Sequence, residues 1–130
     1  MKKTFAELRD ADQLVASLFA KEPALVKSRF GYAWKNFIKK NYDPLFQDFR
    51  EEIEEARLQN ALEDERTHEL LLDAKGGFKF SREGMLNLTR EVRKIQKAYD
   101  AKVVEIKPVL SPFKPKLEPE ELEMLKGLVL

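Results

Sequence analysis

The sequence predicts a mostly helical α+β fold, with a long helical hairpin arm, a small antiparallel β-sheet and one packing helix. Three observations lead to this expectation. Apolar residues recur at helical spacing over residues 5–62 and again over residues 82–99. Gly76 and Gly77 separate two short apolar runs, as the turn of a β-hairpin does. A β-prone run at residues 103–106 follows the last of these helices.

The composition is that of a folded protein with a charged surface. Of the 130 residues, 43% are apolar and 36% are charged, which is enough for one domain with a modest core. A formal net charge of +1 provides no overall field that would attract nucleic acid or a membrane. Cysteine is absent, which excludes disulfides and thiolate chemistry. No apolar run approaches the roughly 20 residues of a membrane span, so we expect no membrane partner.

The first helix has a recognisable beginning and end. Thr4 and Glu7 match a capping box, in which a hydroxyl and a carboxylate accept hydrogen bonds from backbone N–H groups. The apolar spacing then predicts a helix over residues 5–20, which ends before Pro23. The N-terminus turns acidic too early for a signal peptide.

A second helical stretch starts near Pro23 and, if it is unbroken, reaches residue 58 or 62. Asp43 followed by Pro44 interrupts it, because proline cannot donate a backbone hydrogen bond within a helix. We expect a kink or a break at this point. The apolar stripe consists of Val26, Phe30, Trp34, Phe37, Ile38, Tyr42, Leu45, Phe49, Ile53 and Ala56.

Charges are segregated along this arm. Residues 21–41 are mostly basic, whereas residues 43–69 are mostly acidic. A dipolar arm can pair with a copy of itself or with a folded-back neighbour. The alternative is two solvated faces, because exposed charges usually contribute little. The arm also has more apolar stripe than a chain of this size easily buries, so we expect self-association into a homo-oligomer.

Residues 68–107 are expected to form a strand, a glycine turn, a strand, a capped helix and a strand. The strands are predicted at residues 68–72, 78–81 and 103–106. Ser81 is a good N-cap for the helix, whose apolar side chains form a narrow seam. The seam consists of Met85, Leu88, Val92, Ile95 and Tyr99.

We expect a single domain over residues 1–107, with the helical arm at 4–62 and the hairpin, helix and strand at 68–107. Residues 108–130 are expected to form a proline-containing linker and a short C-terminal helix. That helix begins near Glu118, and its acidic first turn suits the helix dipole.

No residue pattern typical of catalysis is present. His68 is the single histidine, and a catalytic or metal-binding role would need a second positioned group. The paired carboxylates within residues 51–55 are interpreted as a solvated helix face. The turn at Gly76 lacks the spacing of a phosphate loop, and Asp73 does not begin a calcium loop. We therefore expect no enzymatic activity, no metal and no cofactor.

Two apolar sets are candidates for partner binding. Phe78 and Phe80 share one face of a predicted strand, and the chain ends in an apolar tail. Either set could instead complete the core, and for the aromatic pair that alternative is preferred. The candidates are Phe78, Phe80, Leu125, Leu128, Val129 and Leu130.

A basic and aromatic segment is a candidate nucleic-acid face. Basic residues could neutralise phosphates, and aromatic rings could stack on bases. The aromatic residues lie largely on the apolar stripe, however, and the net charge is near zero, so packing is the preferred explanation. The basic residues are Lys27, Arg29, Lys35, Lys39 and Lys40.

The order of these elements resembles that of a family of short, uncharacterised proteins encoded by tailed bacteriophages. The turn at residues 75–77 and Pro44 depart from the family's pattern. The resemblance implies a phage origin and a role in the particle or in the host, and it transfers no functional residue. The matching pieces are residues 27–58, 78–80, 82–99, 103–106 and 118–130.

The first functional hypothesis is a non-enzymatic virion protein, a small oligomeric component or accessory of the head or tail. The alternative is an early host-takeover factor that binds and inhibits a host protein, such as RNA polymerase or a defence component. A third hypothesis is a nucleic-acid-binding regulator that uses the face between Lys27 and Lys40. The expected partners are the protein itself and other phage or host proteins, and the expected location is the virion or the host cytoplasm.

Overall fold

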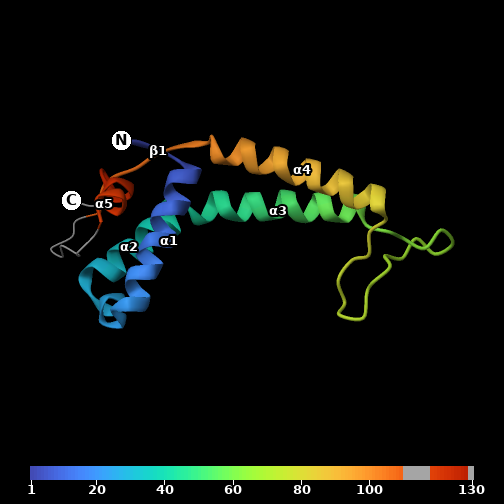
Figure 1. The fold of residues 1–130 in the computed structure, drawn as a ribbon, viewed down its shortest axis with the longest axis horizontal. Helices are drawn as coiled ribbons and strands as arrows, with labels where there is room; N and C mark the ends of the chain where they lie inside the picture. Colours follow the sequence, from blue (N-terminus) through green and yellow to red (C-terminus); the bar gives the residue numbers. More distant parts are fainter. Residues whose placement is uncertain (110–117, 129–130) are drawn as a thin grey trace. The chain divides into compact units, whose positions relative to one another are not determined.

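The computed structural model describes residues 1–109 and 118–128. In these ranges the chain is mostly helical and has one small antiparallel sheet, which confirms the expected α+β class (Figure 1). The elements are β1 (Lys2–Thr4), α1 (Phe5–Lys21), the 3₁₀ helix η1 (Pro23–Lys27), α2 (Arg29–Asn41), α3 (Asp43–Asn60), α4 (Arg82–Asp100), β2 (Val103–Glu105) and α5 (Pro119–Leu125).

The chain divides into two units. Unit 1 consists of Met1–Phe46 and Tyr99–Leu130, and unit 2 consists of Gln47–Ala98. The boundaries fall near the start of α3 and near the end of α4. The C-terminal helix, which is expected to lie outside the domain at residues 1–107, belongs to unit 1.

Helix α1 begins where the capping box predicts and forms part of the core of unit 1. The Thr4 hydroxyl accepts a hydrogen bond from the Glu7 N–H at 3.1 Å, and the Glu7 carboxylate accepts one from the Thr4 N–H at 3.0 Å. These bonds satisfy N–H groups that have no partner inside the helix. The buried face of α1 consists of Phe5, Leu8, Ala11, Leu14, Val15 and Leu18.

Aromatic side chains fill the centre of unit 1. Trp34 of α2 is 2% exposed, and its indole N–H donates to the Asp12 carboxylate of α1 at 3.0 Å. The Phe5 ring stacks on Tyr42 with 4.9 Å between centroids and meets Tyr99 edge-on at 6.0 Å. Such ring pairs stabilise packing beyond the area that they bury.

The second helical stretch is broken at the position that Pro44 predicts. After Pro23 the chain forms the short η1, and α2 then ends at Asn41. Helix α3 begins at Asp43, so Pro44 lies in its first turn. The missing proline N–H costs little there, because N–H groups of a first turn have no partner inside the helix.

The sheet joins the N-terminus to the segment after α4. Strands β1 and β2 pair antiparallel, with Lys3 opposite Val104. This pairing confirms the strand expected at 103–106, which forms over Val103–Glu105. The strand at Lys2–Thr4 was not anticipated, because three residues carry no pattern of their own.

The strands expected at residues 68–72 and 78–81 are wrong. Residues 61–81 instead form an irregular segment with two isolated antiparallel bridges. Most side chains of this segment are exposed, so no continuous apolar face stabilises a longer ladder. The bridges join Leu72 to Phe78 and Glu63 to Leu70.

The glycine turn inside this segment is confirmed. Gly76 has a φ of +81°, a conformation that glycine adopts without steric cost. The Asp73 carboxylate accepts hydrogen bonds from the N–H groups of Lys75 at 2.8 Å and Gly77 at 2.9 Å. The Asp73 N–H donates to the Gly77 carbonyl at 2.8 Å, which closes the turn.

Unit 2 is a two-helix arm in which α3 and α4 lie side by side (Figure 1). As predicted, the Ser81 hydroxyl caps α4 by accepting the Gly84 N–H at 3.0 Å. The Asn60 side chain at the end of α3 donates to the Glu91 carboxylate of α4 at 3.2 Å. A Cβ on Gly84 would lie 2.7 Å from the Asn60 carbonyl oxygen, so glycine allows the helix ends to meet.

Helix α5 and residues 126–128 after it pack into unit 1. Leu125 is 7% exposed and Leu128 is fully buried. The Val109 N–H donates to the Leu128 carbonyl at 2.7 Å. Most of the linker expected at 108–116 lies outside the described residues. Among the described residues, no helix combines the length and the apolar character needed to cross a membrane.

Candidate interaction surface

The arm buries few of its apolar side chains. Unit 2 lies wholly within the described residues, and its buried apolar side chains are Ala56 and Leu88 alone. Soluble proteins rarely expose large clustered apolar side chains unless these bind something. Unit 2 is therefore the candidate interaction surface. Its exposed large apolar residues are Leu58, Leu62, Leu70, Leu71, Leu72, Met85 and Leu86.

Four of these leucines lie on hydrogen-bonded backbone at the end of the arm. The Leu62 N–H donates to the Lys79 carbonyl at 2.8 Å, and the Leu71 N–H donates to the Leu62 carbonyl at 2.9 Å. The Lys79 N–H in turn donates to the Leu71 carbonyl at 3.0 Å. Three stretches of backbone are thus joined, so the leucines between them occupy defined positions. The apolar run at residues 68–72 predicts a strand, so the sequence alone does not reveal this cluster.

Phe78 and Phe80, both candidates from the sequence, are half-buried within unit 2. The Arg57 guanidinium of α3 lies 5.4 Å from the centroid of the Phe78 ring. A cation over an aromatic face is attracted by the ring's quadrupole. Phe78 therefore attaches the segment 61–81 to α3, and the neighbouring leucines are more exposed than either aromatic ring.

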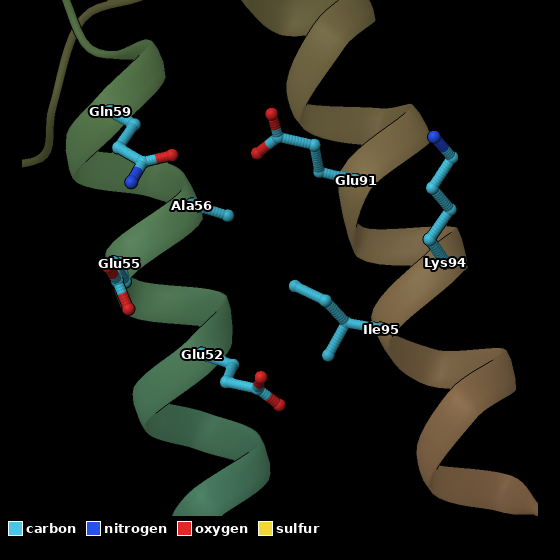
Figure 2. A pocket seen from close by; sticks show the side chains of 7 residues that line it. All are labelled: Glu52, Glu55, Ala56, Gln59, Glu91, Lys94 and Ile95. Atoms are coloured by element: carbon cyan, nitrogen blue, oxygen red, sulfur yellow. The ribbon is translucent and has the colours of Figure 1, made fainter.

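A groove runs between α3 and α4 on one side of the arm and has a volume of about 260 Å³. Figure 2 shows Ala56 and Ile95 pointing toward each other across it, with Glu52 and Glu91 projecting from opposite helices. Its floor is apolar and its rim is mostly charged, as in a groove that receives a helix. The remaining lining residues are Glu55, Gln59 and Lys94.

The candidate nucleic-acid face carries charge without a matching set of exposed rings. Phe30, Trp34 and Phe37 are buried in unit 1, so they cannot stack on bases. Tyr32 is 60% exposed and is the accessible ring of α2, a helix that the structure describes in full. The five basic residues Lys27, Arg29, Lys35, Lys39 and Lys40 are all exposed.

The apolar C-terminal candidates separate into two groups. Leu125 and Leu128 are buried in the core of unit 1, where they pack against its other elements. Val129 and Leu130 lie outside the described residues. The two described candidates therefore lie in the core, whereas Leu122 and Met124 of α5 are exposed.

Titratable groups near the single histidine shape a turn. The His68 side chain is 75% exposed, and its Nδ1 lies 3.4 Å from the Glu63 carboxylate. Hydrogen bonds from the N–H groups of Thr67 and Arg66 lower the pKa of Asp64 below its usual value. Among the described residues, no three histidine, aspartate or glutamate side chains gather in a way that could hold a metal ion.

Comparison of the chain with protein-family models, with curated proteins and with solved structures gave no match. What the protein does must therefore be inferred from its own residues. Of the surfaces described above, the arm is the one that combines exposed apolar side chains, a groove and defined backbone.

Proposed function

We propose that this is a non-enzymatic protein that acts through protein–protein contacts, with unit 2 as its contact surface. The supporting observation is the imbalance within unit 2, where seven large apolar side chains are exposed and Ala56 and Leu88 are the buried ones. Covering apolar surface stabilises a complex by roughly 25 cal/mol per Å² before the costs of association. Docking with a partner protein is the simplest way to cover these side chains.

The more specific proposal is a small oligomeric component or accessory of the head or tail of a tailed bacteriophage. Two features support it: the resemblance of the element order to short tailed-phage proteins, and the segregation of charge between the acidic α3 and the basic α4. Segregated charges favour repeated contacts among copies of one chain. An early factor that binds and inhibits a host protein is the alternative.

Quantitative mass spectrometry of purified phage particles separates the two roles. A virion component is expected at a fixed ratio to the other particle proteins in every preparation. Absence from particles, together with co-purification of one host protein during infection, would contradict the virion role and favour the host-directed one.

A matched pair of variants tests whether the arm is the contact surface. Leu72 of unit 2 is 52% exposed and Val103 of unit 1 is 58% exposed, so replacing either by glutamine should affect folding little. We expect Leu72→Gln to reduce incorporation into particles about tenfold, which corresponds to the loss of one buried leucine contact. Val103→Gln should be incorporated normally. Normal incorporation of Leu72→Gln, or an equal loss for both variants, would count against the arm.

A further inference from the structure

The two helices of the arm carry opposite net charges. Within unit 2, α3 has five carboxylates and two arginines, a net charge of −3. Helix α4, up to residue 98, has five basic side chains and two carboxylates, a net charge of +3. Together these two helix segments carry no net charge, and the acidic helix of one copy matches the basic helix of another.

The groove has this charge separation on its rim. Glu52 and Glu55 line the α3 side. Lys94 lines the α4 side together with Glu91, whose carboxylate accepts a hydrogen bond from Asn60 of its own arm. Glu52, Glu55 and Lys94 take part in no ion pair with another described residue. Charges on an open rim remain available for a partner that approaches the groove.

We propose that a second copy of this chain covers the groove, and that the two arms form a four-helix bundle with a two-fold axis parallel to the helices. The inference rests on the proposed function, in which the arm is the contact surface, and it names the partner. In this bundle α3 of each copy lies antiparallel beside α4 of the other. Every neighbouring pair of helices then combines an acidic helix with a basic one.

The register of the bundle follows from the symmetry. Rotation about an axis parallel to the helices keeps each residue at its own height along the arm. Glu55 and Lys94 line the same groove, so Glu55 of each copy faces the level of Lys94 in the other copy. Because α3 and α4 run antiparallel, three residues back along α3 and three residues forward along α4 cover the same distance in the same direction. Glu52 therefore lies level with Lys97.

Charge selects this packing over the other symmetric one. A two-fold axis perpendicular to the helices would place α3 on α3 and α4 on α4, where like charges face each other. The parallel axis also places the two arm ends at the same end of the bundle. The small Ala56 in the groove lets the helices approach closely.

Charge reversal in the full-length chain tests the pairing. The dimer dissociation constant is measured by sedimentation equilibrium in about 50 mM salt, where exposed charges are weakly screened. We expect Glu55→Lys and Lys94→Glu each to raise it about tenfold or more, because each reversal affects two equivalent pairs in the dimer. The double variant E55K/K94E exchanges the partners and should return to within about threefold of the natural chain.

Arg93→Glu provides the matched control. It makes the same change of charge as Lys94→Glu, but at an exposed position of α4 that does not line the groove. We expect it to change the dimer dissociation constant by less than about threefold. Circular dichroism of each variant checks that the helices are retained. The proposal would be overturned if the natural chain were monomeric at about 100 µM. It would also be overturned if the loss of dimer stability in the double variant equalled the sum of the losses in the two single variants.

The pairing and the proposed function can fail separately. If the natural chain is monomeric while Leu72→Gln still reduces incorporation into particles, the arm contacts another protein and only the pairing is wrong. If the charge exchange restores the dimer but the protein is absent from particles, the pairing stands and the virion role is wrong.

Discussion

At the scale of single residues, the polar groups beside the core of unit 1 find partners. Among the described residues, no buried side-chain nitrogen or oxygen lacks a hydrogen-bond partner. The bond from the Trp34 indole to Asp12 is the main example, because it joins the buried Trp34 of α2 to the half-buried Asp12 of α1. A buried donor without an acceptor is costly, so this bond contributes to the specific packing of the two helices.

Replacing Asp12 should therefore destabilise unit 1. In Asp12→Ala the Trp34 N–H loses its acceptor while the ring stays buried, which costs about 1–3 kcal/mol. Asp12→Asn keeps an acceptor oxygen at the same place and should cost less than half as much. Urea unfolding followed by far-UV circular dichroism measures the free energy of unfolding of both variants. Equal stability of the alanine variant and the natural chain would show that the bond contributes nothing.

The capping box predicts a pH dependence. A hydrogen bond from the Thr4 N–H to the carboxylate lowers the pKa of Glu7 below its usual value and outweighs the opposing effect of burial. Because the folded-state pKa is depressed, the stabilisation is full above about pH 4.5 and is lost as the pH falls through the lowered pKa. Unfolding midpoints of Glu7→Gln and the natural chain should differ near pH 6 and converge at low pH. A difference in unfolding midpoint that does not change with pH would contradict this cause.

Polar contacts between residues that are close in the sequence were predictable, and those between residues far apart in the sequence were not. The caps at Thr4 and Ser81 depend on residues three positions away, so their patterns are visible in the chain. The contact between Asp12 and Trp34 joins different helices, and neither residue has a neighbour that indicates it. Its prediction would need the packing angle of α1 and α2.

At the scale of elements, the helices were predictable because their signal is repeated over many turns. The apolar spacing and the break at Pro44 gave the main helices nearly to their observed ends. The strands were harder because pairing in the sheet is non-local. Residues of β1 pair with residues of β2 about one hundred positions away, and each strand has three residues.

The candidate surface was only partly predictable. The apolar seam of α4 indicated a packing face, and Ile95 of that seam lies in the groove. The three leucines at residues 70–72 were interpreted as strand residues because β-strands and exposed apolar runs look alike over so few positions. Hydrogen bonds of the segment 61–81 decide its shape, and they depend on backbone contacts between residues far apart in the segment.

A single glycine should control the meeting of the two arm helices. Gly84→Ala would normally stabilise a helix by about 1 kcal/mol, but here the added Cβ would lie 2.7 Å from the Asn60 carbonyl oxygen. We expect a net loss of about 1–3 kcal/mol, because the ends of α3 and α4 must separate. Hydrogen exchange of the α4 amides measures the loss. Asn87→Ala, at an exposed position one turn along, is the control and should be neutral or slightly stabilising.

At the scale of the whole molecule, the two units have different kinds of surface. Unit 1 contains nearly all of the described buried apolar side chains, whereas the exposed leucines and the charge-segregated helices lie in unit 2. A unit with a full core is stable by itself, but a two-helix arm with few buried side chains gains stability when a partner covers it. This difference is the physical basis for proposing that the protein acts by contact.

Hydrogen exchange of the full-length chain at two concentrations, about 1 µM and about 100 µM, tests this account most directly. If a second copy covers the arm, the amides of residues 47–60 and 82–98 should exchange more slowly at the higher concentration, and those of α1 and α2 should not change. Identical exchange of the arm at both concentrations, or slowing confined to unit 1, would contradict it.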